Sequence, residues 1–243
     1  AGDSDIAGAE AIVSEAPVGY REDLDPALRE LGEAIEEGDA DLAREITEEL
    51  IEEGFDPEAI LTDSMIAAMQ VVGDRFARNE IFVPEMLLSA RAMKAGLEIL
   101  RPILTDTGVE PVATVILGTV KGDIHDIGKN LVGMMLEGAG FRVIDLGVNV
   151  PASAFVEAIR KHGVHIIGMS ALLTTTMTYM RTVIEALETE GLRDNVKVLV
   201  GGAPLTQEFA DKIGADYYGE NASLAVEAAK KALNDLKKAG LVA

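Results

Sequence analysis

A histidine and two aspartates stand close together in one glycine-containing segment, and their spacing could support metal chemistry. The segment runs from Gly118 to Asn130 and contains Asp123, His125 and Asp126. An imidazole that ligates a metal through one nitrogen usually donates its other N–H to a carboxylate, which fixes the tautomer and raises the basicity of the ring. The Asp-x-His spacing lets one loop supply both groups, although a hydrogen-bonded surface histidine fits the same spacing.

The other residue types restrict the kind of metal site. The sequence has three histidines and no cysteine, which excludes disulfides, thiolate zinc sites and iron–sulfur clusters. A conventional zinc site needs three or four protein ligands. His162 and His165 flank the start of a predicted strand, where we expect structural roles. His125 is therefore the one plausible ligand, and a single protein ligand suits a metal whose other ligands come from a macrocycle.

The same loop could also be a phosphate-binding loop, because glycines precede a helix that is predicted to begin near Gly128-Lys129. The match is poor, since five residues separate Gly122 from Gly128 where a P-loop has four. Asn130 also stands where a serine or threonine would contact magnesium. Nucleotide hydrolysis is therefore disfavoured.

The first part of the chain has the spacing of helices. From Asp25 to about Leu104, apolar residues recur at helical intervals, and Asp-Pro pairs, Pro84 and several glycines delimit four helices joined by short turns. This pattern predicts a small four-helix bundle over residues 21–108. Residues 1–20 mix Gly, Ala and acids without periodicity, and we expect them to form a flexible N-terminal tail.

The second part, residues 109–243, alternates short apolar runs with helical segments. This alternation predicts an α/β fold, a Rossmann-like (flavodoxin-like) domain with a five-stranded parallel sheet covered on both faces. Such sheets bind ligands at the carboxyl ends of their strands, where the strand order reverses. Strands are expected at 112–117, 142–146, 166–169, 196–200 and 216–218, and helices at about 128–137, 152–162, 175–190, 205–213 and 221–238. The loops expected to form the site are 118–130, 170–176 and 201–204.

The net charge of −21 is concentrated near the N-terminus. Residues 1–60 contain 20 Asp or Glu residues against three Arg residues, a balance of −17. Such a surface repels nucleic acid and anionic lipid, so we expect neither as a partner. It is either a solvated face or a docking surface for a basic partner. We see no secretory leader and no apolar run of about 18 residues, and we expect a cytoplasmic protein without a membrane span.

Three motifs, each after a predicted strand, resemble those of B12-binding domains. Gly122–Gly128 resembles their Asp-x-His-x-x-Gly motif, Ser170-Ala171-Leu172 their Ser-x-Leu motif, and Gly201-Gly202 their Gly-Gly motif. Each motif alone is weak, but the three occur in the expected order behind a predicted helical bundle.

The bundle adds to this resemblance. Its segments Gly73–Phe76 and Ile81–Met86 resemble the four-helix cap of methionine synthase and of the corrinoid proteins of methyltransferase systems. The likeness covers about residues 25–238. Gly201–Pro204, followed by Gly214–Asp216, is closer to the methylamine type of corrinoid protein than to the methanol type.

The resemblance implies a role for each matching residue. His125 would be the axial ligand to the cobalt of cobalamin or a related corrinoid, in place of the cofactor's own lower base. Asp123 would hold the other imidazole nitrogen, and Thr176 would continue the relay to solvent. The remaining cofactor-binding residues, some beside a slot for the displaced nucleotide tail, would be Gly122, Ile124, Asp126, Ile127, Gly128, Ser170, Leu172, Thr174, Gly201 and Gly202. Five bundle residues would shield the upper face of the corrin, or else form bundle core: Met65, Met69, Val72, Phe76 and Met86.

The function implied by the resemblance is that of a methyl carrier. The chain would accept a methyl group on cobalt(I) from a substrate held by one partner methyltransferase. It would pass the group from methyl-cobalt(III) to a second methyltransferase with tetrahydrofolate or coenzyme M as acceptor. A reductive activase would be a further partner, and turnover would need these partners. The donor would be a methylamine, a betaine, methanol or an aryl methyl ether.

Other readings of the same residues remain. Two domains account for the 243 residues, so we expect neither the substrate barrel of adenosyl-dependent mutases nor the DNA-binding domain of light-sensing repressors. A cobalamin-binding sensor or storage module without methyl transfer is the main alternative. A flavodoxin-like domain that binds no B12 is a third reading, but it makes the three ordered motifs a coincidence.

Overall fold

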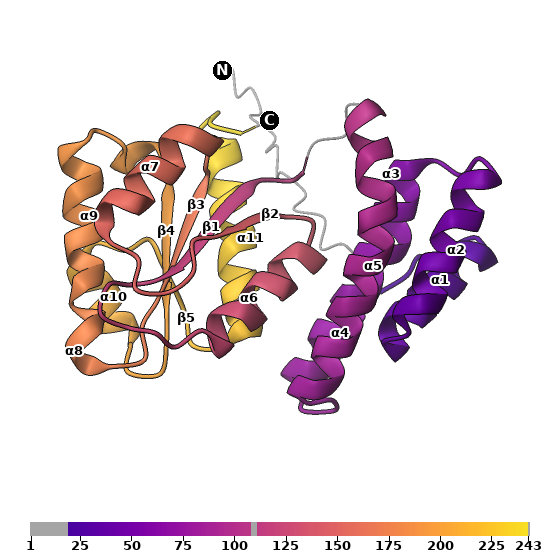
Figure 1. Ribbon diagram of the computed structural model, residues 1–243, viewed down its shortest axis with the longest axis horizontal. Coiled ribbons are helices and arrows are strands. Elements are labelled where there is room, and N and C mark those ends of the chain that lie inside the picture. Colours follow the sequence, from indigo (N-terminus) through magenta and orange to yellow (C-terminus); the bar gives the residue numbers. More distant parts are fainter. Residues whose placement is uncertain (1–18, 108–110, 243) are drawn as a thin grey trace, which may run out of the picture.

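The computed structural model describes residues 19–107 and 111–242. The expected tail lies almost wholly outside these residues, as does the expected boundary between the two parts of the chain near residue 108. A helical bundle and an α/β unit lie side by side (Figure 1). The predicted fold class is confirmed: a helical bundle precedes a five-stranded parallel sheet.

The bundle begins with two capped helices. The side chain of Asp25 accepts a hydrogen bond from the backbone N–H of Ala27, and that of Asp39 accepts one from Leu42. These caps satisfy N–H groups that have no partner inside the helix. Gly38 ends the first helix with φ = 76°, a left-handed conformation that suits glycine. The elements of the bundle are α1 (Pro26–Glu37), α2 (Ala40–Glu52), α3 (Pro57–Ala59), η1 (Ile60–Ile66), α4 (Ala67–Ala77) and α5 (Val83–Thr107).

The third predicted helix is continuous but not uniform. Its middle segment η1 is a seven-residue π-helix between α3 and α4. Ser64 is buried there and donates a hydrogen bond to the backbone oxygen of Leu28 in α1 at 2.6 Å. The fourth helix, α5, runs through Pro102 to Thr107, past the expected end near Leu104. A proline inside a helix removes one hydrogen bond but does not always end the helix.

The α/β unit has one parallel sheet with the strand order β2-β1-β3-β4-β5. All five predicted strands are present, shifted by up to two residues. The strands are β1 (Thr114–Thr119), β2 (Arg142–Asp145), β3 (Ile166–Ser170), β4 (Lys197–Gly201) and β5 (Tyr217–Gly219). The helices are α6 (Ile127–Gly138), α7 (Ala152–His162), α8 (Thr174–Met177), α9 (Tyr179–Thr189), η2 (Arg193–Asn195), α10 (Gln207–Ile213) and α11 (Ala222–Lys238). The helix expected over 175–190 is divided into α8 and α9. The strand order reverses between β1 and β3, which places the ligand edge at the ends of these two strands.

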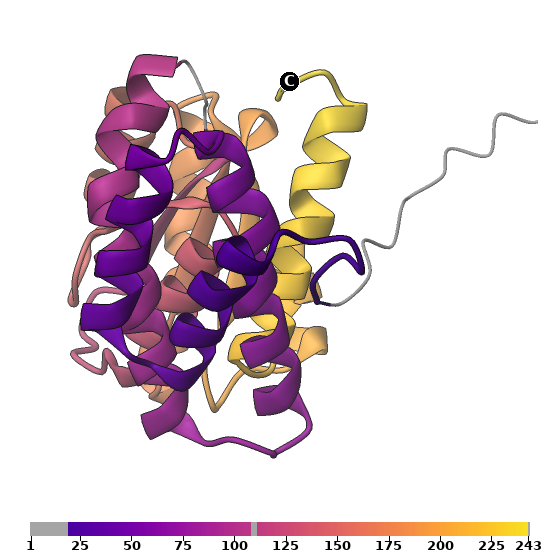
Figure 2. The same ribbon diagram turned by 90° about the vertical axis from the view of Figure 1, so that its right-hand side faces the viewer.

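The two faces of the sheet have different cores. Helices α6 and α11 lie between the sheet and the bundle, whereas α7 and α9 cover the other face (Figures 1 and 2). Successive strand residues point to opposite faces. Leu117 in β1 accordingly belongs to a core that continues into the bundle, and its neighbour Ile116 belongs to the core that contains Phe155.

Glycines bring the bundle close to the α/β unit. A Cβ atom at Gly138, at the end of α6, would lie 2.9 Å from Cγ of Met69 in α4. A Cβ atom at Gly140 would lie 2.9 Å from Cδ1 of Ile66. The turn between α4 and α5 lies at the same end of the molecule as the start of α6 (Figure 1). Among the described residues, no helix is both long and apolar enough to cross a membrane.

Candidate corrinoid site

The loop after β1 holds the predicted ligand in a defined conformation. Gly122 has φ = 88°, and its backbone N–H donates to Oδ1 of Asn149 at 2.8 Å. Thr119 Oγ1, at the end of β1, donates to the backbone oxygen of His125 at 2.8 Å. The loop is therefore held by side chains from the end of β1 and from the segment after β2.

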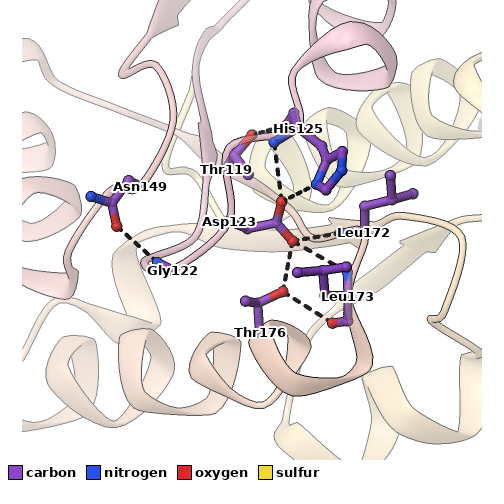
Figure 3. Close-up of polar contacts among 8 residues, drawn as sticks. All are labelled: Thr119, Gly122, Asp123, His125, Asn149, Leu172, Leu173 and Thr176. Carbon is purple, nitrogen blue, oxygen red and sulfur yellow. Dashed lines mark hydrogen bonds and ion pairs between the residues drawn. The ribbon is translucent and has the colours of Figure 1, made fainter.

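Asp123 is the centre of the site (Figure 3). Its Oδ1 atom lies 2.7 Å from Nδ1 of His125 and accepts the backbone N–H of that residue at 3.1 Å. Its Oδ2 atom accepts three hydrogen bonds from the segment after β3: from Thr176 Oγ1 at 2.6 Å, Leu172 N at 2.8 Å and Leu173 N at 3.2 Å. One carboxylate thus joins the loops that follow the two strands at the reversal of strand order.

These contacts determine the charge of Asp123, whose side chain is fully buried. Burial alone raises the pKa of the carboxyl group, because desolvation disfavours the charged form. The hydrogen bonds from Thr176, Leu172 and His125 outweigh burial and hold the pKa of Asp123 well below its usual range. Asp123 is therefore a carboxylate at neutral pH and keeps a proton on Nδ1 of His125.

That proton leaves Nε2 as the nitrogen that can bind a metal. The side chain of His125 is 47% exposed, and Nδ1 faces Asp123 while the other ring nitrogen points away from it (Figure 3). A neutral imidazole that donates through Nδ1 presents a lone pair at Nε2. No group of three or more His, Cys, Asp or Glu residues that could hold a metal occurs in the described part of the chain. This arrangement suits a metal that takes one ligand from the protein.

A deep slot opens beside His125. Its volume is about 540 Å³, and it lies between the sheet and helices α6 and α11. That volume is within the range of about 300–1,000 Å³ that is typical of ligand and cofactor sites. A Cβ atom added to Gly128, which lines the slot, would meet no atom within 4 Å. The glycine therefore leaves room that a ligand could fill, as expected for the tail of a corrinoid.

The surface around His125 is apolar. Ile127 is 81% exposed and Ile124 is 74% exposed, and Leu172 and Leu173 are also exposed beside them. Exposed apolar side chains that gather in one place commonly mark a binding surface. A large, flat, partly apolar ligand above His125 would cover them.

Most of the predicted cofactor-binding residues gather at this edge. Gly202 is required by close packing, because a Cβ atom there would lie 1.9 Å from the backbone oxygen of Ala171. Thr174 is exposed at the start of α8 and does not line the slot. The predicted residues that line the slot are Ile124, His125, Asp126, Ile127, Gly128, Ser170, Leu172, Gly201 and Gly202.

The predicted shielding residues of the bundle lie elsewhere. Met65 and Met86 are fully buried within the bundle core, and Val72 is buried in the same core. Met69 packs against Gly138 at the far end of α6, and Phe76 is partly buried. None of these five side chains lines the slot. A role above the corrin stays a prediction for them.

Sequence reasoning missed several residues that belong to the site. Thr119 and Asn149 hold the loop, and the backbone N–H of Leu173 binds Asp123. The sequence carries no local signal for the contact of Asn149, because Gly122 lies 27 residues away.

Comparisons with known proteins show the family to which the chain belongs. Residues 113–227 match the B12 binding domain family, and residues 27–101 match a second family with the same description. The chain is 45% identical to a corrinoid protein of Desulfitobacterium hafniense over 85% of this chain and 97% of the relative. It is 44% identical to the trimethylamine corrinoid protein of Methanosarcina barkeri, over 83% of this chain and 94% of the relative.

A solved structure is also similar. The methanol:cobalamin methyltransferase complex from Methanosarcina barkeri includes a chain that is 31% identical, with a TM-score of 0.79 over 88% of this chain and 81% of that one. The present chain belongs to the family of B12-binding corrinoid proteins of methyltransferase systems, and its cofactor is cobalamin or a related corrinoid.

Proposed function

We propose that this chain carries a methyl group on the cobalt of its corrinoid between two partner methyltransferases. The observation that carries the proposal is the contact of Asp123 with both His125 and Thr176, beside an open slot. The bound corrinoid would supply the metal that takes up and releases the methyl group.

The residues of the chain would hold and tune the cofactor. His125 would bind the lower face of the metal through Nε2, while Asp123 keeps the proton on Nδ1 and Thr176 Oγ1 keeps the carboxylate in place. A second proton that entered this relay would neutralise the carboxylate, weaken the hydrogen bond at Nδ1 and lower the basicity of Nε2. Protonation of the relay would thus be coupled to the strength of the bond between Nε2 and the metal. Thr174, which is exposed, would contact the nucleotide tail only at its outer end.

The partners follow from the relatives. The chain is 44% identical to the trimethylamine corrinoid protein of Methanosarcina barkeri and 48% identical to a dimethylamine corrinoid protein of Methanosarcina acetivorans. The first partner would be a methylamine-type methyltransferase. The second would transfer the methyl group to tetrahydrofolate or coenzyme M. A reductive activase would restore the reduced metal, and we propose a cytoplasmic protein that acts without nucleic acid.

The two halves would divide the work. Residues 109–243 would bind the cofactor, and residues 21–108 would cap its upper face. Phe76 near the end of α4 and exposed Phe82 in the following turn would contribute to this cap. The turn and the start of α6 lie at the same end of the molecule (Figure 1). The buried residues Met65 and Met86 would support the cap from within the bundle.

The test is an ultraviolet–visible spectrum of the chain loaded with methylcobalamin, for wild type, His125→Ala and the control His162→Ala. We expect wild type and the control to retain the cofactor with its base displaced and histidine bound. His125→Ala should lose the signature of the histidine ligand. Wild-type protein that retains no corrinoid would refute the proposal. A loaded chain that never yields its methyl group to any methyltransferase would be a sensor or storage protein instead.

A further inference from the structure

The slot beside His125 is polar only near its mouth. Its polar side chains come from exposed or half-exposed positions at the carboxyl edge of the sheet: His125, Asp126, Ser170, Glu220 and Asn221. The other charged lining residue, Lys129, is buried, and its Nζ atom already contacts Asp145 Oδ2 at 2.5 Å and Asn130 Oδ1 at 2.7 Å.

The inner end of the slot is apolar on all sides. The sheet contributes buried Leu117 and Leu199, and the Leu117 side chain covers Gly168, where a Cβ atom would lie 2.3 Å from Cδ2. Helix α6 contributes Leu131 and Val132, and helix α11 contributes Ala225.

Backbone groups at the inner end are occupied as well. Leu117 pairs with Gly168, and Gly168 with Leu199, in the continuous ladder β1-β3-β4. Leu131, Val132 and Ala225 lie past the first three residues of their helices, where N–H and C=O groups bond along the helix, and the Ala225 N–H donates to the backbone oxygen of Asn221. A polar group on the buried edge of a ligand would therefore find no partner among the described residues that line this end.

From this distribution we propose that the slot selects corrinoids by the chemistry of the tail base. It favours a base whose buried edge is apolar, such as 5,6-dimethylbenzimidazole, over a purine such as adenine, whose amino group and ring nitrogens need partners. A buried donor or acceptor without a partner is costly. This inference rests on the proposed function, because it places the displaced tail in the slot.

The experiment compares dissociation constants for three corrinoids: cobalamin, its adenine analogue, and cobinamide, which has no tail base. Each is titrated into the chain and followed by absorbance. In the free cofactor, the tail bases bind cobalt with different strengths, and the protein must displace them. The acid titration of each free corrinoid measures this strength, and each dissociation constant is corrected for it. We expect the corrected affinity for cobalamin to exceed that for the adenine analogue by about tenfold or more. Equal affinities, or tighter binding of the adenine analogue, would overturn the inference.

Two variants test whether slot polarity causes the preference. Val132→Thr in α6 and Ala225→Ser in α11 each add a hydroxyl group to the lining of the slot and change the side-chain volume little. We expect at least one of them to reduce the cobalamin preference by about threefold or more, because the added hydroxyl group supplies about one hydrogen bond to the adenine base. The free corrinoids are the same in every titration, so their own base-to-cobalt equilibria cancel in this comparison. A preference that neither variant changes would overturn the inference. If the wild-type chain bound none of the three corrinoids, the proposed function itself would fail.

Discussion

Asp123 organises the site because one buried carboxylate accepts hydrogen bonds on both oxygens from two loops. Hydrogen bonds to a charged acceptor are stronger than those between neutral groups. The Asp123 contacts therefore contribute to the stability of the fold as well as to the orientation of His125. The contribution to stability can be separated from the orientation of His125 by replacing a residue that donates a hydrogen bond to Asp123 while the carboxylate itself is kept.

Thr176→Val should lower the free energy of unfolding by about 1.5–3 kcal/mol, because it removes a 2.6 Å hydrogen bond to a buried carboxylate. Valine has nearly the same shape, so packing changes little. Thr176→Ser keeps the hydroxyl group and should cost less than about 1 kcal/mol. Urea unfolding of the chain without cofactor measures both. A larger loss in Thr176→Ser than in Thr176→Val would show that the methyl group contributes more to the stability of the loop than the hydroxyl group does.

His165 gives the fold a pH dependence. Its Nδ1 atom accepts the backbone N–H of Thr114 at 3.0 Å, and burial lowers the pKa of His165 below its ordinary value of 6.5. The unfolded chain then binds more protons than the folded chain just below pH 6.5. The stability that neutral His165 contributes is fully present above that pH. It is lost as the pH decreases toward the pKa of His165 in the folded chain.

The test compares wild type with His165→Asn between about pH 5.5 and 7, where most carboxyl groups stay charged. Asparagine can still accept the Thr114 N–H through Oδ1 but does not titrate. We expect the stability of wild type relative to this variant to rise across the window. A constant difference would mean that His165 does not titrate differently in the folded and unfolded chains.

At the scale of the elements, one buried hydrogen bond ties the π-helix η1 to α1. Ser64 ties it to α1 through the 2.6 Å hydrogen bond to Leu28, whereas exposed Thr62 in the same segment bonds only its own turn at Glu58. Ser64→Ala should lower the free energy of unfolding by about 1 kcal/mol, and Thr62→Ala by less than about 0.5 kcal/mol. Urea unfolding of the two variants and of wild type measures these losses. A larger effect from Thr62→Ala would show that η1 is stabilised locally and not by α1.

Helix α6 has glycines at both ends, and they should respond in opposite directions to the same substitution. Gly128→Ala puts a methyl group into open space and should leave stability unchanged or raise it by up to about 1 kcal/mol. Gly138→Ala would bring Cβ to 2.9 Å from Met69 Cγ, and overpacking of this kind costs about 1–3 kcal/mol. Thermal or urea unfolding measures both. Destabilisation by Gly128→Ala would show that its glycine is needed for the helix start and not for room in the slot.

At the scale of the whole molecule, the acidic bundle is expected to guide association with a basic partner. The association rate with the first methyltransferase should fall as ionic strength rises, because salt screens long-range attraction. Replacing exposed Glu45, Glu48 and Glu49 in α2 by glutamine should reduce both the rate and its salt dependence. Stopped-flow association measures this. Rates that are independent of salt would make the acidic surface a solvated face only.

Local patterns in the sequence were sufficient for the architecture. Short apolar runs predicted the five strands and helical spacing predicted the bundle, and the Asp-Pro pairs and Gly38 marked real helix ends. The pairing of Asp123 with His125, two residues apart, was also within reach of sequence reasoning. These features depend on near neighbours in the chain, which a sequence displays directly.

Tertiary structure decided which distant residues meet. The Leu172 N–H and Thr176 hydroxyl reach Asp123 from about 50 residues away, and Met65 packs in the bundle core although its spacing equally suited a cap above the corrin. The apolar inner end of the slot is likewise assembled from strands and helices that are far apart in sequence. A sequence determines the periodicity and chemistry of each segment, but burial depends on the packing of all of them. The same methionine can therefore be core or cofactor contact until the folded chain places its neighbours.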